Sequence, residues 1–180
     1  MQTEATSTHW VIDPVHTRIR FESKYLLLTS VSGWFNEFEG TVRSSAENFT
    51  NSEVNVTIYS QSLYTGNEER DNHLRSPDFF DAMNHPIISF RSKQVEAVAQ
   101  ELRVKGDLII KNITQTIEFT CRYIGSICDP QGNKKAGLVA DIALNRKDFN
   151  ITWNQYLDNY GVVVSDEVNL HCDIQLLKLK

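Results

Sequence analysis

The stretch Val168-Asn169-Leu170-His171-Cys172-Asp173-Ile174-Gln175-Leu176 alternates apolar and polar side chains without an error. The same alternation recurs in residues 54–59, 117–123 and 138–144. A period of two residues places successive side chains on opposite faces of a β-strand, so each segment predicts a strand with one apolar and one polar face. A chain built mostly from such strands closes into a sandwich or a barrel. The apolar faces of a barrel either fill its interior or surround an apolar guest.

Strand patterns lie on both sides of one polar interruption, which covers residues 67–82. Asn67 is suited to cap a first short helix there, and Ser76 with Pro77 is suited to begin a second. This order predicts an all-β, up-and-down antiparallel barrel with the helical insert as a lid or plug at one mouth. The expected strands cover residues 10–14, 19–25, 31–42, 54–60, 87–92, 94–98, 102–111, 113–123, 138–146 and 162–176.

The bulk composition predicts one globular domain. The chain has 180 residues, of which 41% are hydrophobic, and this length is sufficient to bury a core. Residues 1–8 are polar and predict a flexible tail, so we expect the domain over residues 9–180. The 18 Lys and Arg against 23 Asp and Glu give a net charge of −5. Such a chain has no general attraction to nucleic acid or anionic lipid, so no nucleic-acid partner is expected.

The sequence shows neither a secretory signal nor a stretch of 18 apolar residues. We therefore expect no integral membrane span and a cytoplasmic location, or a periplasmic one if a leader has been trimmed; transient membrane contact is compatible with both. The three cysteines, Cys121, Cys128 and Cys172, have no C-x-x-C spacing, which argues against a thiolate metal site. Cys121 and Cys172 fall on the apolar phase of their strands, where a free thiol acts as a small hydrophobe.

The common catalytic motifs are missing: the sequence contains no G-x-S-x-G, P-loop or G-x-G-x-x-G pattern. The densest polar cluster is Arg70-Asp71-x-His73 in the expected first helix. In one interpretation Arg70 binds a ligand head group, and Asp71 or His73 acts as an acid or base. In the other, which we favour, Arg70 and Asp71 form an ion pair that anchors the helix over the barrel. His16, after the Asp13-Pro14 turn, is expected to make a hydrogen bond within that turn.

Apolar residues of the insert have two open interpretations. Phe79-Phe80 is either a gate for an apolar ligand or a plug that seals a filled core. Leu74 lies one helical turn from Arg70, so we expect it to pack inward near the same mouth.

The chain resembles the YceI-like family over about residues 9–178. The resemblance rests on the motifs Trp10-x-Ile12-Asp13-x-x-His16, Val31-x-Gly33-x-Phe35-x-x-Phe38-x-Gly40, Arg70-Asp71-x-His73-Leu74-x-Ser76-x-Asp78-Phe79-Phe80-Asp81, Pro86-x-Ile88-x-Phe90-x-Ser92, Gly106-Asp107-Leu108 and Asn145-Arg146-x-Asp148-Phe149. Two departures concern Tyr25, where the family usually has His, and Asn112, where it has Gly in a turn. Asn tolerates a positive φ, so the turn should persist.

The resemblance implies an eight-stranded, lipocalin-like barrel, often described as polyisoprenoid-binding, whose interior holds a long isoprenoid chain. Isoprenoid quinones are candidate ligands, and a homodimer is the expected assembly. No metal and no cofactor apart from such a lipid is expected. The strand phase predicts that these residues face inward: Ile19, Phe21, Phe38, Val56, Ile58, Ile88, Phe90, Leu108, Ile110, Ile117, Phe119, Ile142, Leu144 and Leu170.

These expectations lead to a functional hypothesis, which is non-catalytic binding of a polyprenyl chain or isoprenoid quinone for transport, storage or sequestration. The alternatives are an enzyme that acts on such a molecule through Asp71, His73 or His16, and an interaction module with a filled barrel. Arg70 and Arg146 are the expected polar groups near a mouth. The expected ligand-binding residues are Phe21, Phe38, Ile58, Arg70, Leu74, Phe79, Phe80, Phe90, Leu108, Ile110, Phe119, Leu144 and Arg146.

Overall fold

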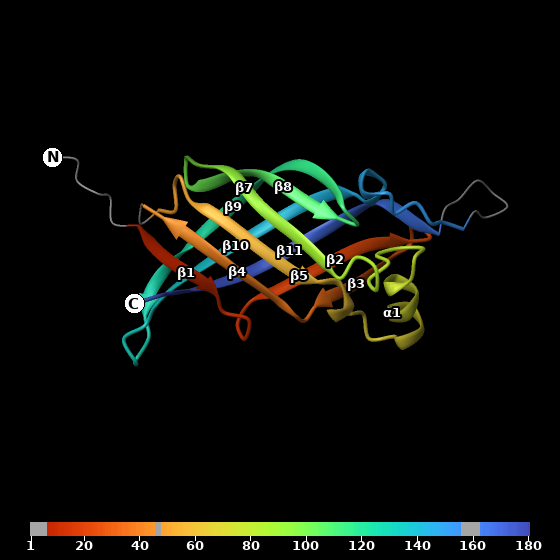
Figure 1. The fold of residues 1–180 in the computed structure, drawn as a ribbon, viewed down its shortest axis with the longest axis horizontal. Coiled ribbons are helices and arrows are strands. Elements are labelled where there is room, and N and C mark those ends of the chain that lie inside the picture. Colours follow the sequence, from red (N-terminus) through yellow and green to blue (C-terminus); the bar gives the residue numbers. More distant parts are fainter. Residues whose placement is uncertain (1–6, 46–47, 156–162) are drawn as a thin grey trace.

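A computed structural model describes residues 7–45, 48–155 and 163–180. Most of this chain is β-strand, and the strands curl into a barrel with one α-helix, α1 (Glu68–Arg75), at one end (Figure 1). Two short 3₁₀ helices are η1 (Ser60–Ser62) and η2 (Arg146–Phe149). The strands are β1 (Thr8–Ile12), β2 (Arg18–Tyr25), β3 (Thr29–Phe35), β4 (Phe38–Ser44), β5 (Glu53–Tyr59), β6 (Leu63–Tyr64), β7 (Ile87–Val98), β8 (Glu101–Ile110), β9 (Ile113–Cys128), β10 (Lys134–Asn145) and β11 (Val164–Lys178).

The sheet closes because β11 pairs with both β10 and β1. β1 and β2 lie end to end along β11, opposite residues 176–178 and 164–173 respectively. In the same way, β3 and β4 form one interrupted strand, and β5 and β6 form another. The result is eight strands, each antiparallel to the next along the chain, which confirms the expected eight-stranded barrel.

Several strand boundaries differ from the sequence expectation, and two of the differences split or join an expected strand. The expected strand 31–42 is interrupted at Asn36 and Glu37, whose backbones bond to Ser62 and Tyr59 at η1. Conversely, residues 87–92 and 94–98 form the single strand β7, with a register shift between Ser92 and Gln94. A bulge inserts one residue and so reverses the alternation of faces, which is why one strand gave the pattern of two.

The helical insert contains one helix rather than two. α1 begins as expected, because the Asn67 side chain accepts a hydrogen bond from the Arg70 amide at 2.9 Å. The prediction of a second helix was wrong. Residues 77–80 form turns instead, in which the Ser76 carbonyl accepts hydrogen bonds from the Phe79 and Asp81 amides. Asp81 has a φ of 47°, which lies outside the right-handed helical region.

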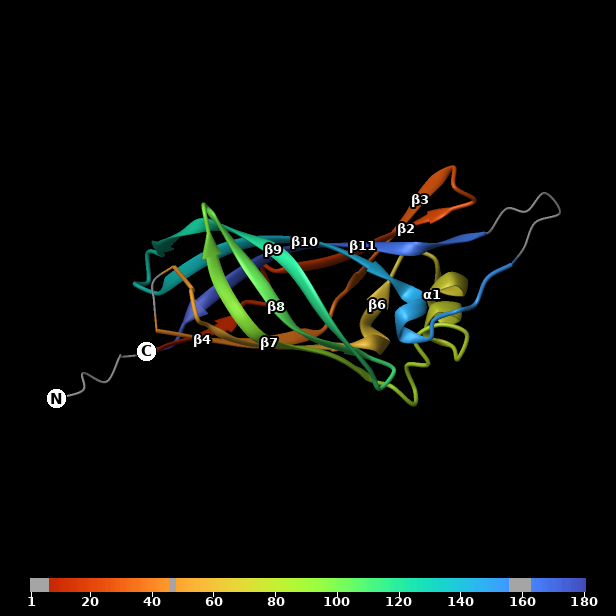
Figure 2. The ribbon, with the colours of Figure 1, turned by 90° about the horizontal axis from the view of Figure 1, so that it is seen from above.

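The helical insert lies at one end of the barrel (Figure 2), where it borders the interior. α1 and the turns after it lie at one end of the barrel, next to η2, and the β2–β3 hairpin projects at the same end (Figure 2). No helix in the described part of the chain combines the length and apolar character needed to cross a membrane.

Candidate ligand-binding lumen

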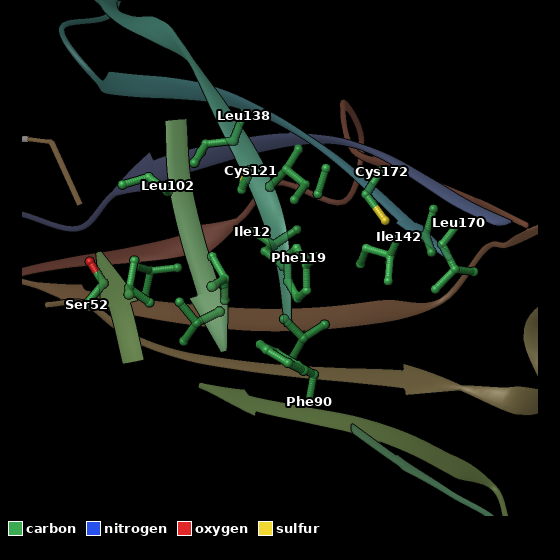
Figure 3. A pocket seen from close by; sticks show the side chains of 18 of the residues that line it. Ile12, Ser52, Phe90, Leu102, Phe119, Cys121, Leu138, Ile142, Leu170 and Cys172 are labelled. Carbon is green, nitrogen blue, oxygen red and sulfur yellow. The ribbon is translucent and has the colours of Figure 1, made fainter. Parts of the chain in front are cut away.

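The barrel encloses a cavity of about 170 Å³, here called the inner chamber (Figure 3). Its wall is built from the inward phase of the strands, because every second residue of a strand faces the same side. Only Thr17 and Ser52 interrupt an otherwise apolar and thiol-bearing lining. The other lining residues are Ile12, Ile19, Val42, Phe49, Val54, Val56, Ile58, Phe90, Val95, Leu102, Val104, Leu108, Ile117, Phe119, Cys121, Leu138, Ala140, Ile142, Leu170, Cys172, Ile174 and Leu176.

A second cavity of about 140 Å³, the outer chamber, lies toward the α1 end. Together the two volumes just reach the lower end of the roughly 300–1,000 Å³ typical of small-molecule sites. Four residues line both chambers, Ile19, Ile58, Leu108 and Leu170, so the chambers meet at an apolar waist. The outer chamber is also lined by Phe21, Ser23, Phe35, Leu74, Phe79, Phe80, Ile88, Ile110, Leu144, Arg146, Phe149, Ile151, Val164 and Val168.

Two thiols form part of the apolar wall. Cys121 on β9 and Cys172 on β11 flank Ala140 of β10 in register, and all three line the inner chamber. Burial, with a smaller effect from Glu101, raises the pKa of the Cys121 thiol from 9.0 to about 12. Burial is also the main reason that the pKa of Cys172 is raised to about 12. Both thiols are therefore neutral at ordinary pH, consistent with their assignment to the apolar phase.

Aromatic rings close the lumen at the end opposite α1. Phe49 packs between Trp10 and Tyr123, with ring centroids 5.3 and 5.7 Å away. It is 3% exposed and holds a φ of 62°, and its carbonyl accepts a 2.7 Å bond from the Ser52 hydroxyl. Phe49 was not predicted as a lumen residue, because it lies in a turn where alternation carries no information.

A second group of rings closes the α1 end. His73, Phe79 and Trp153 contact one another, with centroid separations of 4.7 Å for His73–Trp153, 5.1 Å for His73–Phe79 and 5.3 Å for Phe79–Trp153. His73 is held in this group by a 2.9 Å hydrogen bond between its Nε2 and Asp78. Phe80 packs edge-on against Phe35 beside them. We call His73, Phe79 and Trp153 the ring layer.

Arg146 lines the outer chamber, and its guanidinium bonds to several backbone carbonyls and pairs with Asp166 at 3.5 Å. It is 4% exposed, and its Nη1 donates to the carbonyls of Ile151 (2.8 Å) and Trp153 (2.7 Å). Its Nε donates to Ser165 O at 2.9 Å, and its Nη2 lies 3.3 Å from Val164 O. The guanidinium thereby fastens the segment after η2 to the start of β11, while the aliphatic stem faces the lumen.

Arg70 lies on α1 at one end of the barrel but lines neither chamber, and its contact with a ligand stays a prediction. Its Nε donates to Thr65 Oγ1 at 2.7 Å and its Nη2 to Thr65 O at 2.9 Å. Buried Asp71 accepts bonds from the amide (2.9 Å) and the hydroxyl (2.5 Å) of the same Thr65. Arg70 and Asp71 thus anchor α1 to the barrel through Thr65 rather than through the direct ion pair we favoured.

Phe38 is the other expected ligand-binding residue that reaches neither chamber; it is buried within the core cluster. The remaining ones lie along the lumen wall, so the strand phase brings together residues from distant parts of the sequence. Their contact with a ligand stays a prediction. They are Phe21, Ile58, Leu74, Phe79, Phe80, Phe90, Leu108, Ile110, Phe119, Leu144 and Arg146.

The polar clusters outside the lumen have structural partners. His16 Nδ1 lies 2.8 Å from Asp13 Oδ2, as the turn predicted, and Gln175 of β11 donates to the same oxygen at 2.7 Å. Burial raises the pKa of Asp13, but the bonds with His16, Gln175 and the Val15 amide bring it below 3.8. Within the described residues, no three His, Cys, Asp or Glu side chains gather as a metal site.

Comparison with known proteins identifies a matching family and several similar proteins. The family model described as a YceI-like domain matches residues 10–176. A UPF0312 protein of Staphylococcus aureus strain N315 is 32% identical over 169 residues, which cover 93% of this chain and 96% of the relative.

Solved structures share the fold at lower identity. Burkholderia cenocepacia BcnA superposes with a TM-score of 0.79 and 19% identity, over 91% of this chain and 98% of that one. A polyisoprenoid binding domain from Saccharophagus degradans gives a TM-score of 0.69 and 12% identity, over 94% and 98% of the two chains. The family model matches most of the chain, and the staphylococcal relative aligns with it over nearly the whole length of both proteins. This chain therefore belongs to the YceI-like family.

Proposed function

We propose that this protein binds a long isoprenoid, either a polyprenyl chain or the tail of an isoprenoid quinone, inside its barrel and without catalysis. The observation that carries the proposal is the apolar lumen of two chambers that meet at Ile19, Ile58, Leu108 and Leu170. An elongated, apolar space that has rings at both ends suits a chain that must be kept from water. Transport, storage and sequestration all use this same property.

The energetics of such binding require no directional contact. Each CH₂ group moved from water into the lumen contributes roughly 0.8 kcal/mol. About ten such groups would contribute ~8 kcal/mol before the entropic cost of association is subtracted. Specificity would then follow the length and shape of the tail. The solved relative from Saccharophagus degradans, named as a polyisoprenoid binding domain, adds support by analogy of fold.

The alternatives are less well supported by the same contacts. An interaction module with a filled barrel is disfavoured because the barrel interior contains two chambers. An enzyme using Asp71 is disfavoured because that carboxylate is 3% exposed and already bonded to Thr65. If an Asp71→Asn variant that folds and binds lost turnover of an isoprenoid substrate, the enzyme hypothesis would replace this one. A homodimer and brief membrane contact during ligand exchange belong to the proposal as accompanying features.

The test is recovery of the ligand. Protein purified without detergent would be analysed by native mass spectrometry, and an organic extract of it by liquid chromatography. We expect an apolar molecule that leaves on extraction and is replaced when polyprenols or isoprenoid quinones are supplied. Protein that stays empty after incubation with both ligand classes would contradict the proposal.

A further inference from the structure

An open groove of about 420 Å³ lies outside the lumen, between the β2–β3 hairpin and α1. Both elements project at the same end of the barrel (Figure 2). Unlike the two chambers, the groove has both polar and apolar walls, and none of its lining residues is shared with them. It is lined by Tyr25 and Val31 of the hairpin and by Asn67, Glu69, Arg70 and His73 of the insert.

Several hydrogen-bond donors in this groove are not used by the fold. The Nε and Nη2 atoms of Arg70 donate hydrogen bonds to Thr65, whereas its Nη1 makes no hydrogen bond within the described residues. Asn67 caps α1 with its side-chain oxygen, which leaves its amide nitrogen for another partner. The Tyr25 hydroxyl belongs to a side chain that is 43% exposed. A ligand group rich in acceptors would satisfy these donors.

The charges around the groove argue against an anionic ligand. Arg70 is balanced by Glu69 on the groove wall, and Glu68 lies beside it at the start of the helix. Asp78 is hydrogen-bonded to His73. A phosphate group needs a net positive surrounding, whereas a neutral carbonyl or ether oxygen needs only donors.

The ring layer lies between this groove and the outer chamber. His73 lines the groove, Phe79 lines the outer chamber, and their ring centroids are 5.1 Å apart. Trp153 contacts both rings. A partition two contacting rings thick lets the two ends of a single molecule occupy the two spaces once these side chains turn aside.

We infer that the groove binds the polar end of the lumen's ligand, and that this end is a neutral group with carbonyl or ether acceptors, such as a quinone ring. The inference rests on the proposed function, because it assumes a tail in the lumen. Arg70 Nη1, the Tyr25 hydroxyl and the Asn67 amide donate to the head group. The tail passes the ring layer into the outer chamber. Arg70 therefore binds ligand from outside the barrel while it also braces α1.

The test compares four ligands that share a farnesyl tail: the hydrocarbon farnesene, farnesol, farnesyl diphosphate and a farnesyl-substituted benzoquinone. Binding of each to the full chain would be measured by titration. We expect the quinone to bind most tightly, by roughly two- to tenfold for each hydrogen bond that its oxygens accept.

Variants locate the head group. Tyr25→Phe removes one exposed hydroxyl and should lower quinone affinity roughly two- to tenfold while leaving farnesene affinity unchanged. Tyr64→Phe, which alters an exposed tyrosine outside the groove, is the matched control and should change neither. Arg70→Gln should lower quinone affinity further, with a thermal melt to confirm folding. Tyr25→Phe keeps the test valid if Arg70→Gln does not fold.

Fluorescence gives an independent readout of position, because a bound quinone quenches nearby tryptophan. We expect Trp153→Phe to reduce the quenching, with Trp34 of β3 contributing the remainder, and Trp10→Phe, at the far end of the lumen, to retain it. Equal binding of quinone and farnesene, unchanged by Tyr25→Phe, would overturn the head-group site and leave the proposed function intact. Tightest binding by the diphosphate would overturn the neutral head group. Failure of all four ligands to bind would instead contradict the proposed function itself.

Discussion

Gly106 of β8 sits where no side chain fits. A Cβ atom there would lie 2.4 Å from the Arg91 carbonyl oxygen and 2.6 Å from Cζ of Phe90, a lumen residue. Because backbone cannot move aside cheaply, we expect Gly106→Ala to lower the free energy of unfolding by about 1–3 kcal/mol. Urea denaturation would measure it.

Gly137 of β10 provides the matched control. A Cβ at that position meets its nearest neighbour, Ile124 Cβ, at 3.6 Å, which is ordinary contact. We expect Gly137→Ala to change stability by less than about 0.5 kcal/mol. Equal urea midpoints for the two variants would mean that Gly106 is not needed for close approach.

At this scale, alternation predicted which face a residue lies on but not where its side chain ends. It placed Leu108 and Ile142 on the lumen wall, because strand phase alone decides their direction. It could not place Arg70, whose long side chain turns to Thr65, or Phe38, which is inward but buried within the core. Phe49 escaped prediction because its position depends on a turn with a positive φ.

The β2–β3 hairpin carries a turn that its residues do not favour. Leu26 and Leu27 have φ values of 52° and 58°, and Leu28 N donates to Tyr25 O at 3.0 Å, which defines a type I′ turn. Such turns prefer Asn-Gly, because a bulky side chain in the left-handed region is strained. Leu26→Asn combined with Leu27→Gly should therefore raise stability by about 1–3 kcal/mol.

The measurement for this turn is the melting temperature of the double variant beside that of Leu28→Asn. Leu28 is 82% exposed and has no positive φ, so its replacement should leave the melting temperature nearly unchanged. No gain in the double variant would show that the turn is not strained. The β8–β9 turn already follows the preference in part: Asn112 holds a φ of 63°, as its sequence predicted.

The turn between β1 and β2 should make stability depend on pH. Asp13 joins this turn to β11 through Gln175, and its hydrogen bonds hold its pKa below 3.8. A carboxylate with a lowered pKa in the folded state contributes stability that is complete above 3.8 and is lost as pH falls through the folded pKa. Asp13→Asn should therefore cost about 1–3 kcal/mol near neutral pH and progressively less in acid.

Urea unfolding at a series of pH values would measure the difference between wild type and Asp13→Asn. Asp148→Asn, at an exposed carboxylate on η2, is the control and should run parallel to wild type. A difference for Asp13→Asn that stays constant into acid would contradict this account.

Among the elements, strands were predictable and their interruptions were not. β9 and β10 were identified from alternation, since each keeps one phase through its apolar core. The bulge in β7 reverses that phase, so the sequence pattern gave two strands. Ser76 and Pro77 are good helix-starting residues, yet the chain there turns to place Phe79 over the outer chamber. Tertiary packing overrides local propensity at that point.

For the whole molecule, alternation implied a closed apolar interior but not whether it is hollow. Whether the interior is hollow depends on the total volume of the inward side chains of all eight strands. The alternation within a single strand does not contain that information. Small residues at inward positions are the relevant feature. Ala140, 2% exposed, faces the inner chamber between Cys121 and Cys172.

Filling that space tests whether the lumen is the binding site. Ala140→Leu adds three carbons to the wall of a cavity of about 170 Å³, so it should lower the affinity for a polyprenol at least tenfold. Ala143→Leu, on the outer face of the same strand, is the matched control and should bind normally.

Thermal shift separates this effect from misfolding. A ligand at 100 times its Kd stabilises the folded state by about 2.7 kcal/mol, and a tenfold loss of affinity cuts this to about 1.4 kcal/mol. Polyprenol should therefore raise the melting temperature of wild type and Ala143→Leu at least about twice as much as that of Ala140→Leu. Without ligand, Ala140→Leu should melt close to wild type, because the added side chain fills existing space instead of displacing neighbours. An Ala140→Leu protein that melts normally and still binds polyprenol with wild-type affinity would place the binding site outside the inner chamber.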